Sequence, residues 1–301
     1  MSIDPVCRTR IPCLLDLRWW HDASARKIDS MNKIWFVTGT SSGFGRLWAE
    51  AALERGDSVI ATARSLESLQ DLPERFPETV LTLELDVTDR QAAFSAVDQA
   101  VARFGRIDVV VNNAGYGHFG MVEELTEREL RRQLETNFFG AVWVTQAVLP
   151  VLRRQGSGHI LQVTSEGGLH AYPGIGAYHA SKWALEAISE SLWQEVAGFG
   201  IQVTCVEPGP YKTDWLDRGS RHSDELPQYA QSRLDNAVDF DIGLAAATKP
   251  AILALVDAED PPHRLLLGNL FPEIEKLYQE RLQTWREWQP VSLAAFGTPA
   301  D

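Results

Sequence analysis

The sequence predicts an α/β fold in which a doubly wound parallel sheet of about seven strands carries helices on both faces. From Lys33 onward, short apolar runs rich in β-branched residues alternate with segments long enough to be helices. Because these runs are almost entirely apolar, the strands are expected to be buried on both faces, as in parallel sheets covered by helices. No linker, repeat or low-complexity tract interrupts positions 33–290, and this continuity favours a single domain.

The strands and helices are expected at the following positions. The strands are Ile34–Thr38, Ser58–Ala63, Val80–Leu85, Val109–Asn112, His159–Thr164, Val203–Glu207 and Leu265–Leu267. The helices between them include Phe44–Arg55, Asp89–Phe104, Glu127–Leu152 and Ala177–Phe199. In a doubly wound sheet, ligands bind beyond the carboxyl ends of the strands. A last amphipathic pattern, from Glu273 to Trp288, is expected to pack on the domain or on a partner subunit.

Composition excludes several classes of function. The chain has 301 residues, of which 45% are hydrophobic and 23% are charged, which is typical of a soluble globular protein. Its net charge of −13 argues against nucleic acid or an anionic membrane as the main partner. The 3 cysteines contain no CxxC pair and the 7 histidines have no HExxH spacing, so no metal site is expected. This cysteine usage suits a reducing compartment, and a cytoplasmic location is expected.

The first 30 residues differ from the rest of the chain. They contain an apolar patch, Ile11–Trp20, which Asp16 and Arg18 interrupt, so they make a poor secretory signal. We interpret positions 1–30 as an extension that is either a short packed helix or disordered, and Met31 as an alternative start. The domain is expected to span 31–290, followed by a tail at 291–301.

A glycine-rich loop follows the first expected strand. It reads Thr-Gly-Thr-Ser-Ser-Gly-Phe-Gly over positions 38–45, with a helix directly after it. Glycines let the backbone turn sharply and approach a pyrophosphate, which the helix N-terminus then stabilises. The alternative is a glycine-rich turn without a ligand. The expected phosphate-binding positions are Gly39, Ser41, Ser42, Gly43, Phe44 and Gly45.

The end of the second strand indicates which dinucleotide is preferred. An acidic residue there would bind the ribose hydroxyls of NAD and repel a 2′-phosphate. This chain has Arg64 and Ser65 instead. A guanidinium can bind a phosphate through two hydrogen bonds, so NADP is predicted over NAD. The alternative is a solvated arginine at the start of the next helix.

Tyr178 and Lys182 are candidates for proton transfer. Residues four apart share a helix face, so the phenol and the ammonium can lie side by side. A neighbouring cation favours the phenolate and lowers the pKa of a tyrosine toward neutral pH. Ser165, 13 residues before Tyr178 at the end of an apolar run, could hold a substrate oxygen. An isolated pair at this spacing is more often an ordinary surface pair.

Together these motifs resemble the short-chain dehydrogenase/reductase family, in its single-domain type with a Rossmann-type sheet, over about residues 31–288. Each further position that the resemblance implies also has a structural alternative, as a helix cap, a strand-end hydrogen bond or a turn. The cofactor positions implied are Asp86 and Val87 near the adenine, Asn113, Ala114 and Gly115 (after Asn112) in the cleft, and Pro208, Gly209 and Thr213 near the nicotinamide.

The resemblance also implies a reaction. It is an NADP-dependent transfer of a hydride between nicotinamide and a carbonyl/secondary alcohol pair, in which Tyr178 donates the proton and Ser165 binds the substrate oxygen. Lys182 and the cationic oxidised nicotinamide would lower the pKa of Tyr178, and Lys182 would also hold the ribose. Asn137 would position a water molecule that links Lys182 to solvent. The family further implies a homodimer or homotetramer.

Two alternatives to this activity are open. A non-catalytic NADP-binding sensor of the same fold is disfavoured by the intact set of four catalytic positions. An epimerase or dehydratase of the two-domain relatives is remote, because their glycine loop is spaced differently.

The substrate is predicted less sharply, as a lipophilic or small ketone. Residues 208–215 look like a branch with retinol- and hydroxysteroid-dehydrogenase-like reductases. Glu166 is interpreted as a solvated loop carboxylate, or as a group that selects a polar part of the substrate. Tyr211 is expected to cover the nicotinamide end differently from a smaller residue, and His118 to be a hydrogen-bonded loop residue. The expected pocket walls are Tyr116, His118, Phe119, Leu169–Tyr172 and the lid-like segment Tyr211–Phe240.

Overall fold

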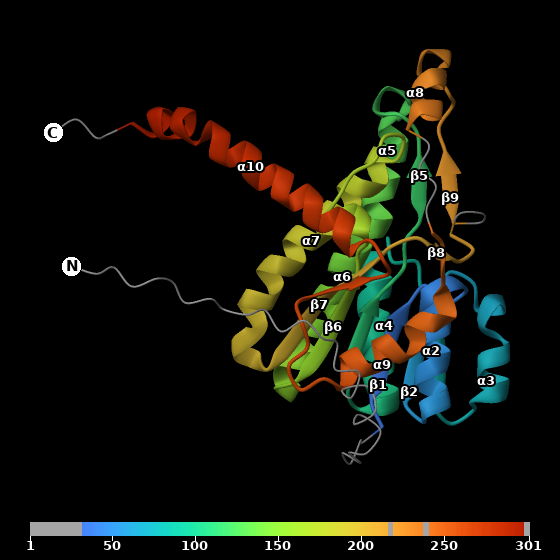
Figure 1. The fold of residues 1–301 in the computed structure, drawn as a ribbon. Coiled ribbons are helices and arrows are strands. Elements are labelled where there is room, and N and C mark those ends of the chain that lie inside the picture. The colour runs from blue at the N-terminus through green and yellow to red at the C-terminus, as the bar shows by residue number, and fades with distance from the viewer. Residues whose placement is uncertain (1–31, 216–218, 237–240, 298–301) are drawn as a thin grey trace, which may run out of the picture. The chain divides into compact units, whose positions relative to one another are not determined.

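Seven parallel strands form the central sheet, in the order β11-β7-β6-β4-β1-β2-β3. The computed structural model describes residues 32–215, 219–236 and 241–297 (Figure 1), so the predicted extension at 1–30 lies outside the described residues. Because β1 pairs with β2 on one side and β4 on the other, the strand order reverses there, which confirms the doubly wound class. The strands are β1 (Ile34–Thr38), β2 (Ser58–Ala63), β3 (Val80–Glu84), β4 (Val109–Asn112), β6 (Gly158–Val163), β7 (Ile201–Pro208) and β11 (Arg264–Leu267).

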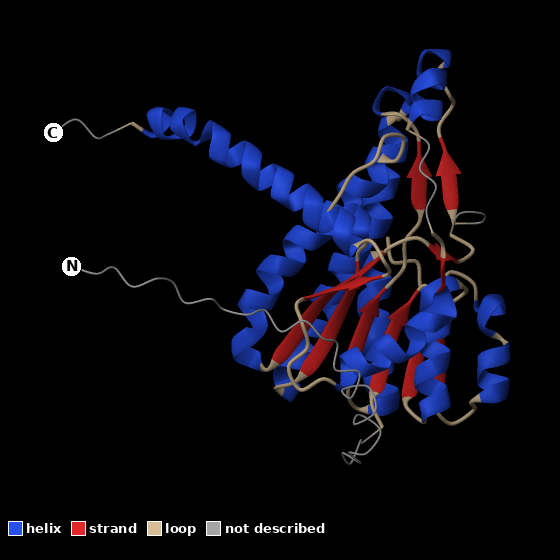
Figure 2. Ribbon diagram, viewed as in Figure 1, coloured by secondary structure: helices blue, strands red, loops and turns tan. Residues whose placement is uncertain are grey.

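Helices cover both faces of this sheet (Figure 2). Successive strand residues point to opposite faces, and in β1 this sends Trp35 and Val37 to one core and Phe36 to the other. The first core is closed by α2 (Gly43–Arg55), α3 (Asp71–Arg75) and α9 (Lys249–Asp257). The second is closed by α4 (Arg90–Phe104), α6 (Gly140–Gln155) and α7 (Gly176–Val196). Two buried cores therefore hold the carboxyl ends of the strands in place.

One predicted helix is interrupted. The segment expected as Glu127–Leu152 consists of α5 (Glu127–Leu134), a π-helical turn (Glu135–Phe139) and α6. A capping box between Thr126 and Glu129 starts α5. Inserted π-turns are rare and occur frequently at functional sites. The remaining predicted boundaries differ from the observed ones by at most two residues, except at three helix ends. The helix α6 ends at Gln155 rather than Leu152, and α7 ends at Val196, after which Ala197–Phe199 forms a 3-10 turn. The C-terminal helix ends at Phe296 rather than Trp288.

Smaller elements stand beyond the carboxyl ends of the strands. There β5 (Gly117–Phe119) pairs with β9 (Ser220–His222), and β8 (Tyr211–Lys212) pairs with β10 (Gly243–Leu244). The short helix α8 (Ala230–Asp235) lies near the tip of this region in Figure 1. The remaining short turns are 3-10 helices at Leu66–Leu69, Val122–Glu124, Glu166–Gly168, Pro227–Tyr229 and Ala245–Thr248.

The C-terminal helix α10 (Phe271–Phe296) confirms the predicted amphipathic helix and continues past Pro290. Ile274 in its first turns is buried, and the Arg281 guanidinium lies 5.1 Å from the Trp183 ring centroid on α7. Beyond that point the helix extends away from the sheet (Figure 1), and large apolar side chains such as Trp285 are exposed. Across the described residues, no helix has the length and apolar character that crossing a membrane requires.

Candidate active site

The glycine loop after β1 is held by hydrogen bonds from the segment after β4. Asn113 Nδ2 donates to the carbonyl oxygens of Thr38 and Gly39, at 2.9 and 3.1 Å. The backbone N–H groups of Asn113 and Ala114 both donate to Thr38 Oγ1 at 3.0 Å. A Cβ atom on Gly45 would lie 2.4 Å from Asn113 Nδ2, so only glycine fits there. Asn113 therefore fixes the shape of the loop.

This loop presents a helix N-terminus that fits a phosphate group. Ser42 is the N-cap residue of α2, its side chain makes no capping hydrogen bond, and the first turn holds no acidic residue. The N–H groups of that turn are therefore free for an anion. Gly43 has a φ of 60°, and the only atom within 4 Å of a Cβ placed there belongs to Thr213, at 3.8 Å. Thr213 therefore lies next to Gly43 of the predicted phosphate loop, and no other atom of the described residues crowds the backbone at Gly43.

The predicted adenine and ribose contacts lie at the same edge of the sheet. Arg64 and Ser65 directly follow β2 and are exposed, and Arg64 makes no ion pair with any described residue. The Asp86 carboxylate accepts hydrogen bonds from the backbone N–H and hydroxyl of Thr88, at 3.0 and 2.8 Å. Val87 is buried against Gly140. Asp89, rather than Asp86, caps α4.

Tyr178 and Lys182 lie on successive turns of α7, as the sequence predicted. Lys182 Nζ is 5.6 Å from the Tyr178 ring centroid and donates to the carbonyl oxygen of Val163, at the end of β6, at 2.7 Å. This hydrogen bond anchors the buried ammonium at the carboxyl end of the sheet. The tyrosine and the lysine are therefore brought to the same place as the ends of the strands.

Ser165 joins these two residues from the opposite side. It follows β6, is buried, and hydrogen-bonds with the Tyr178 side chain. Its Oγ also accepts from the N–H of Gly167 at 3.0 Å and donates to the carbonyl oxygen of Pro208 at 3.3 Å. The serine hydroxyl and the phenol thus converge on one point.

The electrostatics of this trio differ from the expectation. Burial raises the pKa of Tyr178, although the hydrogen bond with Ser165 opposes that effect. Burial also lowers the pKa of Lys182 to about 8, against the charge of Glu186, which raises it. The protein's own groups therefore raise the pKa of Tyr178, because the desolvation of the phenolate, together with the charge of Glu166, outweighs the hydrogen bond with Ser165. The predicted lowering would have to come from the cationic nicotinamide.

Asn137 lies in the π-helical turn and is buried. Its Nδ2 donates to the carbonyl oxygen of Tyr116 at 2.9 Å and to Ser181 Oγ at 3.1 Å, and its Oδ1 accepts from the Tyr116 N–H at 3.0 Å. A Cβ placed on Gly115 would lie 3.1 Å from Asn137 Oδ1 and 3.7 Å from Lys182 Nζ. Asn137 and Lys182 therefore border the same small volume above Gly115.

Of the two interpretations of Glu166, a solvated loop carboxylate is wrong, and a group that selects a polar part of the substrate stays a prediction. The side chain is only partly exposed, and its Oε2 is shielded from solvent without a hydrogen-bond partner among the described residues. Burial raises the pKa of Glu166 to about 7, although a hydrogen bond with Tyr172 opposes the shift. The signal in the sequence was its position directly after the end of an apolar strand.

Trp215 lies in the expected lid-like segment Tyr211–Phe240, but the sequence did not single it out by itself. Its ring packs edge-on against Tyr178, with centroids 5.1 Å apart, and against Phe119, with centroids 5.8 Å apart. A Cβ on Gly117 would lie 2.3 Å from the Trp215 ring, so the absence of a side chain there lets the indole approach. Trp215 thus connects Tyr178 with the predicted substrate side.

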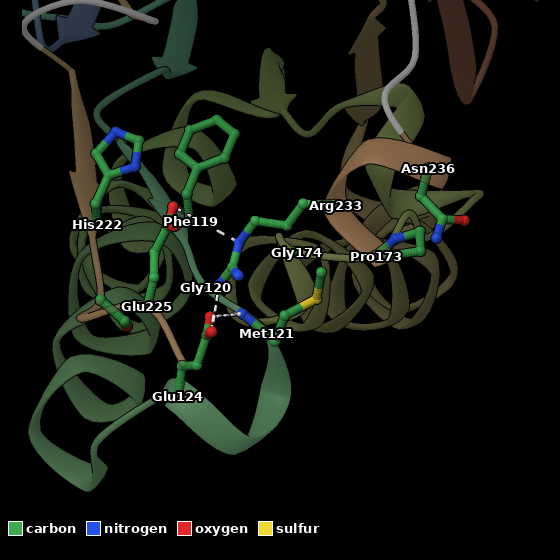
Figure 3. Close-up of a pocket in the computed structure, with 11 residues that line it drawn as sticks. Phe119, Gly120, Met121, Glu124, Pro173, Gly174, His222, Glu225, Arg233 and Asn236 are labelled. Atoms are coloured by element: carbon green, nitrogen blue, oxygen red, sulfur yellow. Dashed lines mark hydrogen bonds and ion pairs between the residues drawn. The ribbon is translucent and has the colours of Figure 1, made fainter. Parts of the chain in front are cut away.

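A cavity of about 220 Å³ opens on that side (Figure 3). Phe119, Met121 and Gly174 line it, together with His222 and Arg233 from the segments around β9 and α8. Arg233 pairs with the buried Glu124, which also accepts from the N–H of Met121 at 2.7 Å. Of the predicted walls, Phe119 and part of the Tyr211–Phe240 segment line this cavity, while residues 237–240 lie outside the described residues.

His118 and Tyr211 have structural contacts. His118 is buried and hydrogen-bonds with Ser223 Oγ at 2.9 Å, so it is hydrogen-bonded as predicted, but it lies in strand β5 rather than in a loop. The Tyr211 ring packs edge-on against Phe44 of the glycine loop, with centroids 5.4 Å apart. Tyr211 therefore covers the loop from the side of β8. Within the described residues, no group of three or more histidines, cysteines or carboxylates is placed to hold a metal ion.

Known proteins are similar to this chain in sequence and in fold. The family model described as short chain dehydrogenase matches residues 33–223. Oxidoreductase BOA17 of Botryotinia fuckeliana is 42% identical over 274 residues, which cover 88% of this chain and 100% of that protein. The 3-ketodihydrosphingosine reductase of Bacteroides thetaiotaomicron is 34% identical, over 88% of this chain and 96% of that protein.

Solved structures agree. A short-chain dehydrogenase from Streptomyces avermitilis superposes with a TM-score of 0.82 and 40% identity, over 88% of this chain and 99% of that chain. An alcohol dehydrogenase from the archaeon Thermococcus sibiricus, complexed with 5-hydroxy-NADP, superposes with a TM-score of 0.67 and 26% identity, over 78% of this chain and 95% of that chain. The fold and the site define an NAD(P)-dependent oxidoreductase. The chain belongs to the short-chain dehydrogenase family.

Proposed function

We propose that this protein is an NADP-dependent reductase that interconverts a ketone and its secondary alcohol, with a lipophilic or small ketone as substrate. The convergence of Tyr178, Ser165 and Lys182 next to the glycine loop carries the proposal. A proton donor and a hydroxyl that binds oxygen stand together beside a helix N-terminus that fits a pyrophosphate. The 3-ketodihydrosphingosine reductase among the relatives supports a lipophilic ketone.

Each residue of the site has one role in the proposed reaction. NADPH, when bound, supplies the hydride. Ser165 Oγ donates a hydrogen bond to the carbonyl oxygen, where negative charge develops. Tyr178 transfers its phenolic proton to that oxygen, which needs no ionised tyrosine in the reductive direction. Lys182 holds the ribose. Asn137 holds a water molecule through which a proton returns from solvent. Both side chains border the space next to Gly115.

The preference for NADP rests on the residues after β2. Arg64 is exposed and Ser65 follows it, so both are free to bind a 2′-phosphate at the edge of the sheet. A guanidinium and a phosphate form strong charge-assisted hydrogen bonds. The NADP analogue bound to the Thermococcus sibiricus enzyme supports the same choice.

The experiment that tests this function is the consumption of NADPH and of NADH against a panel of ketones, quinones, retinoids and steroids. The proposal expects at least one ketone to be reduced, with NADPH preferred. Tight NADPH binding without turnover of any compound would contradict the proposal and favour a non-catalytic NADP-binding sensor. No observation on the described residues supports such a sensor.

We further propose that the protein forms a homodimer through α10 and acts in the cytoplasm. Phe271, Tyr278, Leu282, Trp285 and Phe296 recur at spacings that place them on one stripe of the helix, and each is exposed. The four aromatic side chains alone expose on the order of 500 Å². A stable interface buries about 800 Å² per partner, which a second α10 laid along the stripe approaches. The proposal of a cytoplasmic location rests on the cysteine usage, which suits a reducing compartment.

Light scattering after size exclusion tests the dimer. Replacing Leu282 and Trp285 by glutamate should yield a monomer, whereas Gln283→Glu, on another side of the helix, should leave the dimer intact. A wild-type monomer, or a double variant that remains dimeric, would contradict this interface.

A further inference from the structure

Glu166 places a carboxylate beside the position proposed for the substrate oxygen. It directly follows Ser165, and successive Cα atoms lie about 3.8 Å apart. Ser165 has an extended backbone, and the 3-10 turn Glu166–Gly168 bends the chain immediately afterwards. Burial is the main cause of the raised pKa of Tyr178, and the charge of Glu166 raises it further. Glu166 therefore lies close enough to the reacting centre to influence it.

This carboxylate has no cationic partner among the residues that the structure describes. Its one polar contact that affects its ionisation is the hydrogen bond with Tyr172, and Oε2 has no partner among the described residues. Two neighbouring groups cannot supply a charge. Burial lowers the pKa of His179 to about 4, so it is neutral near pH 7, and the Lys182 ammonium is directed to Val163. An unpaired carboxylate away from water is costly.

The other shielded carboxylates of the described chain are paired with arginine. Glu124 pairs with Arg233, and Glu186 and Glu207 share Arg264. Each pair offsets the loss of hydration with a charge-assisted hydrogen bond. Glu166 differs from them because it directly follows Ser165 and its charge acts on Tyr178. The cation that would complete the pattern must therefore come from a ligand.

Building on the proposed oxidoreductase function, we propose that Glu166 binds the ammonium group of substrates that carry a protonated amine on the carbon next to the carbonyl carbon. Ser165 holds the carbonyl oxygen, and the adjacent residue then reaches the next substituted carbon. The ammonium donates a hydrogen bond to Oε2 and neutralises the carboxylate. Part of the Glu166 side chain is exposed, so a ligand can reach it from the cleft.

The same contact discriminates against neutral ketones. A substrate with a methyl group in place of the ammonium leaves Glu166 unpaired and adds no hydrogen bond. Sites built to bind a polar substrate group reject analogues that lack it, because their own polar atoms are then left without partners. Glu166 is therefore a specificity-determining residue for 2-amino ketones and the corresponding amino alcohols.

The test compares matched alcohols that differ in one group. The amines are 1-aminodecan-2-ol and 2-amino-1-phenylethanol, and their methyl counterparts are undecan-3-ol and 1-phenylpropan-1-ol. Oxidation with NADP⁺ is measured at pH 8, where Glu166 is ionised. The wild-type enzyme should show a kcat/KM at least tenfold higher for the amines. Glu166→Gln should lower this preference to less than threefold, mainly through a higher KM for the amines.

Control variants and a binding measurement distinguish a failure of this inference from a failure of the proposed function. Glu127→Gln, which removes an exposed carboxylate from α5, should preserve the preference, and Glu166→Asp should retain part of it. Dissociation constants for the NADP⁺-loaded protein are measured in parallel by tryptophan fluorescence. If no alcohol is oxidised but the amines bind tenfold tighter to wild type than to Glu166→Gln, the proposed function fails and this inference stands. Equal affinity for amine and methyl compounds, or an equal preference for decane-1,2-diol, would overturn it.

Discussion

On the cofactor side of the site, Asn113 ties the glycine loop to β4 with hydrogen bonds of 2.9 and 3.1 Å, and Lys182 is anchored to β6 at 2.7 Å. On the substrate side, Trp215 touches Tyr178 through ring contacts, and Glu166 keeps an oxygen without a partner. In the first region, hydrogen bonds within the protein fix the glycine loop and Lys182. The second leaves surfaces and charges for a ligand to complete.

The cofactor side contains the features that members of a family share, whereas the substrate side contains those that decide which substrate a single member accepts. Hydrogen bonds to strand ends fix positions to within a fraction of an ångström because the sheet itself is packed on both faces. Loops beyond the sheet carry fewer such constraints, and their side chains decide which substrate fits. Four substitutions can break or sharpen the comparison, in order of decreasing expected effect.

The largest effect is expected where the two regions meet, at Tyr178. Tyr178→Phe removes the proton donor but keeps the ring that packs on Trp215. A positioned general acid contributes about a hundredfold to ten-thousandfold, so ketone reduction should fall by about a thousandfold. NADPH binding, measured by fluorescence titration, should be unchanged. Retention of most of the activity would remove Tyr178 from the mechanism.

Glu166→Gln tests, through the melting temperature of the protein, whether the charge on the substrate side lacks a partner. The pKa of Glu166 is about 7 in the folded protein against 4.5 for the free side chain. As pH rises from about 4.5 to 7, the unfolded chain loses its proton first, so the native state loses stability, on the order of 3 kcal/mol at most. The variant should therefore melt at a higher temperature than wild type at pH 8 and at the same temperature near pH 4.5. Equal melting temperatures at pH 8 would show that Glu166 is well solvated.

Arg64→Ala tests the outer end of the cofactor side. Losing charge-assisted hydrogen bonds worth about 1.5–3 kcal/mol should weaken NADPH binding by roughly tenfold to a hundredfold. NADH lacks the 2′-phosphate, so its dissociation constant should not change. Equal weakening of both dinucleotides, measured by titration, would exclude Arg64 from the choice of cofactor.

Gly45→Ala tests how tightly the cofactor side is packed. The added Cβ would lie 2.4 Å from Asn113 Nδ2 and 2.5 Å from the Gly39 carbonyl oxygen. Overpacking of this kind costs about 1–3 kcal/mol, so the variant should have a lower melting temperature and bind NADPH more weakly. Gly198→Ala, where a Cβ meets no atom within 4 Å, is the matched control and should behave as wild type.

The fold was predictable from the sequence because its signal is local. Apolar runs such as Ser58–Ala63 became strands with the same bounds, since their residues are buried on both faces of the sheet. The π-helical turn at Glu135–Phe139 was not predicted, because its apolar and polar spacing is compatible with a continuous helix. Contacts of Asn137 with Tyr116 and Ser181, far apart in sequence, accompany it.

The cofactor residues were found from motifs, and the substrate residues largely were not. The glycine loop and Tyr178 carry a spacing that chemistry requires. Trp215 reaches Tyr178 only because Gly117 lacks a side chain, and no spacing in the sequence reports that contact. Burial of Glu166 depends likewise on Tyr172 and on the turn that follows Ser165. Such properties belong to the tertiary structure rather than to a pattern.

Hydride transfer itself is tested most directly with NADPH carrying deuterium at C4 of the nicotinamide. The protein is incubated with this cofactor and a ketone from the panel, and the alcohol is analysed by mass spectrometry and NMR. The account predicts deuterium on the carbinol carbon, with one stereoisomer of the cofactor as donor, and formation of this alcohol about a thousandfold more slowly by Tyr178→Phe. An alcohol without deuterium on that carbon would contradict the central claim.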